Sequence, residues 1–165
     1  MISIIGCGYI GLISAICWAS KGHTVHCVDI DLEKIDQLKS GQLPFYEKGL
    51  DDLFEKHKSN IRFSSNFSLI TDSKYIIMAL GTPRKDDGSI DISQVEKALD
   101  LVLDNKNIGE KEKYIIFRST MPPGTVESLL MPKTRDFKNI KLVHNPEFLR
   151  EGSAIDDFFN PSRVV

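Results

Sequence analysis

Three glycines near the amino terminus leave this chain few ways to begin folding. Gly6, Gly8 and Gly11 follow the apolar run 1–5 and open the apolar segment 10–21, which indicates a strand, a turn and a helix. In a G-x-G-x-x-G turn, the first glycine allows a tight bend, the second lets the backbone approach a pyrophosphate, and the third lets the helix pack closely on the strand. The helix then points its free N–H groups at the phosphates. The turn therefore predicts a dinucleotide site.

The first 20 residues carry no charge, a feature that a membrane helix or a signal peptide would share. A signal peptide would need a basic region ahead of the apolar stretch, and this chain has none. One continuous membrane helix would have to tolerate the three glycines in its first half. A buried strand, a glycine turn and a buried helix account for the whole stretch, so we predict no membrane segment.

The overall composition fits one globular domain. The 165 residues are 41% hydrophobic and 27% charged, which is enough to bury a core. The net charge of -2 offers no basic surface, so we expect no nucleic-acid partner. Cys7, Cys17 and Cys27 form no C-x-x-C pair, and we expect reduced, structural thiols in the cytoplasm. The histidines have no ligand spacing, so no metal is predicted.

Short apolar runs alternate with segments of helical periodicity. The predicted strands are 1–5, 24–28, 61–63, 75–80, 114–119 and 141–144. The predicted helices are 10–21, 31–39, 49–59 and 92–103, the second with Asp31 as its N-cap. The runs YIIMAL and YIIFRS are typical of parallel strands buried on both faces. We predict an α/β fold over 1–165, a doubly wound Rossmann-type, mostly parallel sheet with helices on both faces.

Asp29 ends the predicted second strand, 18 residues after Gly11. An acid at this place in a dinucleotide fold binds the ribose hydroxyls and would repel the 2′-phosphate of NADP, so it predicts NAD. The alternative is that Asp29 only caps the next helix. Asp31 can already fill that role.

Two threonines follow predicted strands at the edge of the sheet where ligands bind. Thr82 lies in MALGTPRKDDGS and Thr120 in FRSTMPPGT, and their hydroxyls can bond to cofactor, water or substrate. Turn-forming glycines and prolines surround both, so plain loop chemistry explains them equally well, with Thr125 as a helix N-cap.

The stretch NPEFLREG places Glu147 and Glu151 four residues apart, with Arg150 beside the second. Because it follows a predicted strand, Glu147 is expected at the ligand edge, where a general base must come within hydrogen-bond reach of its proton. Two structural alternatives stay open. Carboxylates at i and i+4 are commonly a solvated helix face, and Arg150 can equally be a surface partner for one of them.

Together these motifs resemble those of one known family. The stretches GCGYIGL, CVDID, GQLPFYEKGL, GTPRKDDGSID, RSTMPPGT and NPEFLREGSAIDDFFNPSRVV are similar to the UDP-glucose/GDP-mannose dehydrogenase family, from Ile4 to the last residue. RSTMPPGT and NPEFLREG are far more specific than a glycine turn. The region CVDIDLEKIDQLKSGQLPFYEKGL resembles the UDP-glucose 6-dehydrogenase branch more than the N-acetylmannosamine branch.

The resemblance implies an NAD-dependent oxidoreductase acting on a sugar nucleotide. The full-length protein would oxidise the primary alcohol of UDP-glucose to the carboxylate of UDP-glucuronate, for polysaccharide biosynthesis, and reduce two NAD⁺. In this family a cysteine thiolate captures the aldehyde and water hydrolyses the thioester, which divides a hard oxidation into steps. That cysteine lies in a second part, a central helix and a C-terminal UDP-sugar-binding domain absent from this chain. The chain alone is expected to be inactive.

The resemblance also implies roles for individual positions. The expected cofactor-binding residues are Gly6, Gly8, Tyr9, Ile10, Gly11, Asp29, Lys34, Thr82, Thr120 and Glu151. The expected substrate-binding residues are Glu147, Phe148, Leu149, Arg150 and Glu151. Thr120 and Glu147 are the expected catalytic residues. Thr120 would hold the water that hydrolyses the thioester, and Glu147 would act on that water or on neighbouring proton transfers.

Other functions share parts of this pattern. Members of the same family act on GDP-mannose or UDP-N-acetylmannosamine, and most discriminating contacts would lie in the absent part. A non-catalytic NAD-sensing module would need neither RSTMPPGT nor NPEFLREG, and a simple hydroxyacid dehydrogenase shares the fold without them. We expect a UDP-sugar as substrate, a cytoplasmic location, and a homodimer or higher homo-oligomer for the full-length protein.

Overall fold

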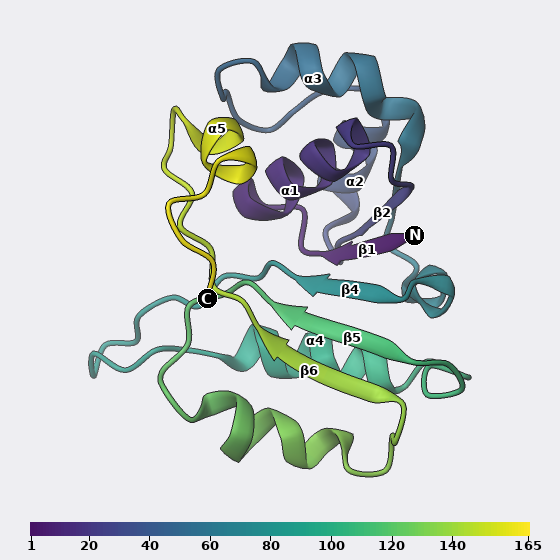
Figure 1. The fold of residues 1–165 in the computed structure, drawn as a ribbon, viewed down its shortest axis with the longest axis vertical. Coiled ribbons are helices and arrows are strands. Elements are labelled where there is room, and N and C mark those ends of the chain that lie inside the picture. The colour runs from purple at the N-terminus through teal and green to yellow at the C-terminus, as the bar shows by residue number, and fades with distance from the viewer.

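The computed structural model describes residues 1–165, and its centre is a six-stranded sheet (Figure 1). The strands are β1 (Ile2–Ile5), β2 (Val25–Val28), β3 (Ile61–Ser64), β4 (Tyr75–Met78), β5 (Lys113–Phe117) and β6 (Ile140–His144). Their order is β3-β2-β1-β4-β5-β6, and every neighbouring pair is parallel. The predicted doubly wound Rossmann-type fold is confirmed, with a sheet that is wholly parallel.

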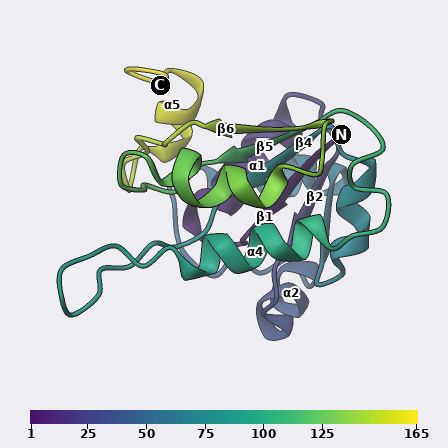
Figure 2. The same cartoon turned by 90° about the horizontal axis from the view of Figure 1, so that it is seen from below.

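Helices cover both faces of the sheet. They are α1 (Tyr9–Ser20), α2 (Leu32–Lys39), α3 (Leu50–His57), α4 (Ser93–Leu103) and α5 (Ala154–Phe159), with the shorter helical segments η1 (Lys58–Asn60), η2 (Phe67–Asp72), η3 (Val126–Leu130) and η4 (Met131–Thr134). On one face α1 packs on the sheet, and α3 and α5 pack on α1 (Figure 1). On the other face lie α4 and the helical stretch η3–η4 (Figure 2).

The uncharged amino-terminal stretch forms β1, the glycine turn and α1. All residues of β1 are buried, as is every residue of α1 from Gly11 to Cys17. A helix that is apolar all round must be covered all round, and here the sheet covers one side of α1 while α3 and α5 cover others. No helix in the chain combines the length and the apolar character needed to cross a membrane.

Two helix ends follow their sequence signals. The Asp31 carboxylate accepts a hydrogen bond from the Lys34 backbone N–H at 3.1 Å, which confirms it as the N-cap of α2. Gly22 lies just beyond α1 with a φ of 86°, the left-handed conformation in which many helices end. Thr125 does not cap with its side chain, because its hydroxyl donates to the Pro122 carbonyl at 2.7 Å.

The register of the sheet brings the carboxyl ends of the strands to one edge. Ile5 pairs with Val28 and Met78, and Phe117 pairs with Met78 and His144. The arrowheads of β1, β4, β5 and β6 point to the same side in Figure 1, where α5 and the C-terminus also lie. Residues that closely follow these strands therefore meet along one edge, which is where ligands bind in such sheets.

Candidate functional site

The glycine turn between β1 and α1 is built by close backbone contacts. Gly6 has a φ of 96°, and a Cβ there would lie 2.4 Å from the Ala79 carbonyl oxygen. A Cβ on Gly11 would lie 1.8 Å from the Gly6 carbonyl oxygen, so Gly11 has the packing role predicted for it. A Cβ on Gly8 would meet nothing within 4 Å. Gly8 therefore faces open space, where a ligand can approach the backbone.

Asp29 follows β2 beside this turn and gathers three donors. Its carboxylate accepts from the Cys7 N–H at 2.7 Å, from the Asp31 N–H at 3.0 Å and from the Lys34 ammonium at 3.1 Å. Asp29 is 9% exposed. It ties the glycine turn to the start of α2, while the N-cap of α2 is Asp31, so the helix-cap alternative for Asp29 is wrong.

A hollow of about 460 Å³ lies over the glycine turn. Asp29 and Lys34 line it on the β2 side, and Gln94 and Leu101 line it on the α4 side. Two apolar side chains on its wall are exposed, Ile30 at 76% and Leu101 at 43%. Exposed apolar groups with a few polar groups between them suit a flat aromatic ring joined to a sugar.

A second hollow of about 340 Å³ adjoins the first, because residues of the glycine turn and of the loop after β4 line both. Besides Gly8, which lines both hollows, five of the predicted site residues meet on its wall: Tyr9, Ile10, Thr82, Thr120 and Glu147. They come from α1, from the loops after β4 and β5, and from the segment after β6. The two hollows together run along the carboxyl edge from Asp29 to Glu147.

The loops after β4 and β5 are joined at this second hollow. The Thr82 hydroxyl donates to the Thr120 carbonyl at 2.8 Å. The Ser119 hydroxyl donates to the Leu80 carbonyl at 2.6 Å and accepts from the Leu80 N–H at 3.3 Å. Ser119 was not predicted, although its place beside Thr120 in RSTMPPGT marked it. These bonds fix two predicted residues, Thr82 and Thr120, side by side.

Arg118 also lines the second hollow and was not predicted. It follows β5 directly, is partly buried, and donates to the Asn145 side-chain oxygen. Burial lowers the pKa of Arg118, while the nearby Glu147 carboxylate acts in the opposite direction. The hollow thus holds one cation and one acid, and the signal for Arg118 was its position at a strand end.

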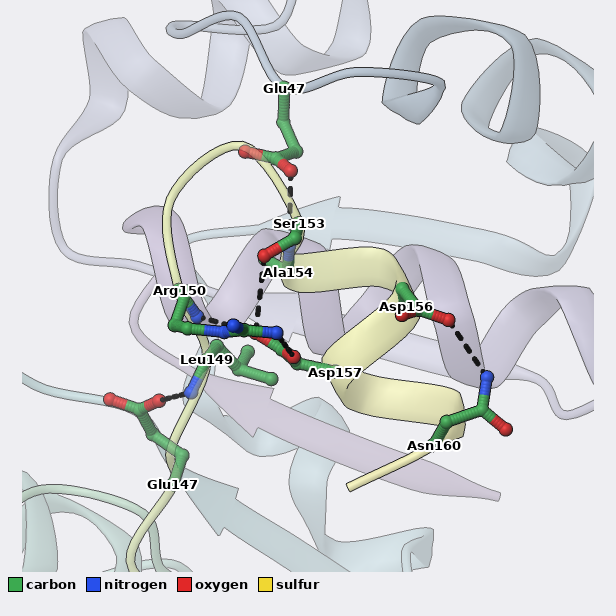
Figure 3. Close-up of polar contacts among 9 residues, drawn as sticks. All are labelled: Glu47, Glu147, Leu149, Arg150, Ser153, Ala154, Asp156, Asp157 and Asn160. Carbon is green, nitrogen blue, oxygen red and sulfur yellow. Dashed lines mark hydrogen bonds and ion pairs between the residues drawn. The ribbon is translucent and has the colours of Figure 1, made fainter. Parts of the chain in front are cut away.

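The segment NPEFLREG is irregular, so the solvated-helix alternative for its two glutamates is wrong. Glu147 accepts from the Leu149 N–H at 2.6 Å. Arg150 pairs with neither glutamate, contrary to the surface-partner alternative. It pairs with Asp157 of α5 at 2.7 Å, and its backbone N–H donates to the same carboxylate at 2.9 Å. Figure 3 shows Arg150 turned towards α5 and Glu147 turned away from it.

The other predicted substrate residues do not line the second hollow. Phe148 and Leu149 line a third hollow of about 170 Å³ with Trp18, and this hollow adjoins the second through Arg118 and Glu147, which line both. The Arg163 guanidinium lies 4.7 Å from the centre of the exposed Phe148 ring. Arg150 and Glu151 are exposed and line none of these three hollows. Of the predicted substrate-binding residues, only Glu147 lines the hollow that contains Thr120.

Glu47 is a further residue that sequence reasoning missed. It lies in the loop before α3 and is 2% exposed. Its carboxylate accepts from the Tyr9 hydroxyl at 2.7 Å and from the N–H groups of Gly152 and Ala154 at 2.8 and 3.1 Å. Nothing in the local pattern PFYEKGL separates a buried acid from an exposed one.

The first hollow fits a dinucleotide by the chemistry of its walls. Gly8 leaves open space at the start of α1, where the first-turn N–H groups lack acceptors within the helix. Such a terminus binds phosphate. Asp29 lines the same hollow on the β2 side, where its carboxylate could accept from ribose hydroxyls. Tyr9, Ile10, Thr82 and Thr120 would meet the nicotinamide half in the second hollow.

Comparison with known proteins gives a consistent assignment. The model of the UDP-glucose/GDP-mannose dehydrogenase family, NAD binding domain, matches residues 1–165. The UDP-glucose 6-dehydrogenase TuaD of Bacillus subtilis is 42% identical over 99% of this chain and 36% of its own length. The structure of a UDP-glucose dehydrogenase from Pyrobaculum islandicum superposes with a TM-score of 0.89 and 32% identity, covering 99% of this chain and 39% of that one.

A GDP-mannose dehydrogenase from Pseudomonas aeruginosa, solved as a ternary complex, is equally similar in shape. Its TM-score is 0.89 at 31% identity, over 99% of this chain and 39% of that chain. This chain therefore spans well under half the length of these relatives, 36–39% of each.

Proposed function

The chain belongs to the UDP-glucose/GDP-mannose dehydrogenase family as its NAD-binding domain, and on that premise we propose that the complete protein oxidises UDP-glucose to UDP-glucuronate. Converting a primary alcohol to a carboxylate removes two hydrides and takes up one water, so each turnover would reduce two NAD⁺. The catalytic cysteine would lie in a C-terminal UDP-sugar-binding domain joined through a central helix. This chain alone is expected to bind NAD⁺ without turning over.

The pair of adjoining hollows along the carboxyl edge is the observation that carries this proposal. The first extends from Asp29 to the glycine turn, and the second from that turn to Thr120 and Glu147. A dinucleotide stretched across both would place its redox end beside an acid and a hydroxyl. When bound, NAD⁺ supplies the hydride acceptor. A module that only senses NAD has no need of an acid at that end.

We assign the adenosine end to the β2 side of the first hollow. The Asp29 carboxylate would accept from the ribose hydroxyls, and the Lys34 ammonium, 3.1 Å from that carboxylate, would hold it in place. Gly8 would let the pyrophosphate reach the backbone of the turn and the N–H groups that open α1. These residues bind and orient the cofactor, and none of them transfers a proton.

We assign proton handling to the second hollow. Glu147 would act as a general base towards a water held by the Thr120 hydroxyl, which requires both groups within hydrogen-bond reach of that water. The partly buried Arg118 would offset the negative charge that develops there. Phe148 to Glu151 would then form the wall that meets the sugar nucleotide, completed by the other domain.

GDP-mannose and UDP-N-acetylmannosamine are the alternative substrates, since the contacts that distinguish them would lie outside this chain. We favour UDP-glucose on the likeness of the region around GQLPFYEKGL to that branch. We place the reaction in the cytoplasm, because the three cysteines are free and buried, and unpaired thiols are typical of a reducing compartment. We also propose that the product is used in polysaccharide biosynthesis. The complete protein would assemble as a homodimer or a larger homo-oligomer.

Calorimetry on this chain tests the cofactor half of the proposal. We expect NAD⁺ to bind and UDP-glucose to bind little or not at all. A folded chain that binds UDP-glucose but not NAD⁺ would contradict the assignment. The complete protein tests the rest, with an expected release of two NADH per UDP-glucose. Faster oxidation of GDP-mannose or UDP-N-acetylmannosamine would replace the substrate named here.

A further inference from the structure

Glu47 is a carboxylate buried without a cation. It is 2% exposed, whereas its neighbour Tyr46 is 82% exposed. All ion pairs in the chain lie elsewhere, so no lysine or arginine neutralises it. Burying a lone carboxylate costs considerable free energy unless hydrogen-bond donors surround it. The fold keeps this acid buried, so its surroundings must supply such donors.

The donors come from segments far apart in the sequence. Tyr9, the first residue of α1, is 38 positions from Glu47, and Gly152 and Ala154 are 105 and 107 positions away. The Tyr9 hydroxyl and the Gly152 N–H share Oε2, and the Ala154 N–H takes Oε1. Figure 3 shows Glu47 reaching from its loop to the turn that opens α5. One side chain thus joins the cofactor turn to the end of NPEFLREG.

These bonds keep the carboxylate charged. Burial alone would raise the pKa of Glu47, but the three hydrogen bonds outweigh it and hold the pKa below its usual value. The negative charge of Asp157 acts against this effect. Burial, together with the bond to Glu47 and the nearby Glu151 charge, raises the pKa of Tyr9, so its hydroxyl keeps the proton that it donates.

The turn at 151–154 has few other polar bonds to the rest of the chain, although Ala154 is buried and α5 packs on α1 through apolar side chains. Helix α5 is only six residues long, and its N-cap residue Ser153 makes no side-chain cap bond. The Arg150–Asp157 ion pair shapes the turn but joins two parts of the same segment. Glu47 caps the start of α5 from another part of the chain, in place of a local cap.

We propose that Glu47 is a positioning residue, which fixes the end of the NPEFLREG segment to the first residue of α1. It thereby sets how Glu147 stands relative to the glycine turn. The importance of Glu47 for the reaction rests on the proposed function, in which the glycine turn binds the cofactor and NPEFLREG meets the substrate. The effect of Glu47 on the position of the NPEFLREG segment is independent of that function.

The chain contains its own reporter of this attachment. Trp18 is the single tryptophan, and its ring centre lies 5.4 Å from that of Phe158 in α5. Detachment of α5 would expose Trp18 to water and shift its emission to the red. Amide exchange at Gly152 and Ala154 reports the two backbone bonds directly.

The test compares Glu47→Gln with a control, Glu55→Gln. The control also removes the charge of a glutamate, but Glu55 is exposed and forms an ion pair with Lys58. The glutamine NH₂ replaces an acceptor oxygen in a site where all three partners donate, so at least one bond is lost. We expect exchange at Gly152 and Ala154 to rise about tenfold or more and Trp18 emission to shift, with β1 and β4 unchanged. Glu55→Gln should match the wild type.

A folded Glu47→Gln chain with wild-type exchange at both amides would overturn the proposal. If that variant does not fold, Tyr9→Phe takes its place. Removing one donor raises the pKa of Glu47, so acid should detach α5, read by Trp18 emission, at higher pH than in the wild type. An unchanged acid midpoint would equally overturn the proposal.

In the complete protein, Glu47→Gln should raise KM for the sugar nucleotide more than it weakens NAD⁺ binding, because Glu47 holds the end of NPEFLREG by two bonds and the start of α1 by one, and α1 is buried in the core besides. Equal effects on both would argue against a positioning role. The exchange measurement needs no turnover, so the two proposals fail separately. Faster exchange in a protein that oxidises no sugar nucleotide would keep the attachment role and remove the proposed function.

Discussion

Gly8 and Gly11 lie three residues apart and carry different constraints. A Cβ on Gly11 would lie 1.8 Å from a backbone oxygen, whereas one on Gly8 would meet nothing within 4 Å. Gly11→Ala should therefore destabilise the fold by about 3 kcal/mol or more, since backbone must move. Gly8→Ala should change stability by less than about 1 kcal/mol but weaken NAD⁺ binding, because its methyl group occupies the space left for the pyrophosphate.

Urea unfolding and NAD⁺ calorimetry on the two glycine variants separate these effects. Equal unfolding midpoints for Gly11→Ala and the wild type would contradict the packing role of Gly11. Unchanged NAD⁺ affinity in Gly8→Ala would place the pyrophosphate elsewhere.

Asp29 combines a structural and a predicted binding role. Asp29→Asn keeps the shape of the side chain and the acceptor for one of the two bonds from Cys7 and Asp31, which go to different oxygens, but removes the charge that faces the ribose. We expect NAD⁺ affinity to fall about tenfold while NADP⁺ affinity falls far less, because the 2′-phosphate no longer meets a carboxylate. Asp36→Asn, an exposed acid on α2, is the matched control. Equal losses for both cofactors would sink the assignment.

Between secondary-structure elements, Ser119 is the link that joins the loops after β4 and β5. It is 7% exposed and bonds to both backbone groups of Leu80. Ser119→Ala should leave those groups unsatisfied and cost about 1–3 kcal/mol. Ser128→Ala is the control, because the Ser128 hydroxyl is exposed and bonds only to the carbonyl of Gly124, four residues earlier. Thermal unfolding that gives the same midpoint for both variants would show that the loops are held by other contacts.

Across the whole domain, the attachment of α5 should depend on acid. Hydrogen bonds from the Arg150 guanidinium and backbone lower the pKa of Asp157 to about 2, and the pKa of Glu47 is also lowered. When the pKa of a carboxyl group is lower in the folded protein than in the unfolded chain, where it is about 4, the group stabilises the fold above about pH 4. This stabilisation is lost as the pH falls to the folded-state pKa. The domain should therefore lose stability progressively from about pH 4 to about pH 2.

The urea midpoint measured at a series of pH values tests this dependence, with Asp157→Asn as the variant. Its curve should be flatter than that of the wild type over the same range, because one group with a lowered pKa is gone. Parallel curves would mean that the Arg150–Asp157 pair does not contribute to acid sensitivity.

Local patterns were enough to predict the α/β class, the glycine turn, the Asp31 cap and every strand. Each of these depends on residues within a few positions, such as the spacing of Gly6, Gly8 and Gly11 or the apolar run of β4. The position of Glu147 at the carboxyl edge followed from the same reasoning, because parallel strands end together. Family membership followed from longer motifs, RSTMPPGT and NPEFLREG.

Only the tertiary structure decided which polar groups are buried and what they contact. Glu47 is surrounded by donors more than 100 positions away as well as by Tyr9, and Arg150 takes Asp157 rather than either glutamate. Arg118 and Ser119 gained their places from the pairing of β5 with β4 and β6. Whether a polar residue is buried depends on elements from elsewhere in the chain that pack against it, and these cannot be predicted from the residues next to it in sequence. The sequence by itself determined the scaffold and the family, and the packing of distant segments determined how the site is held together.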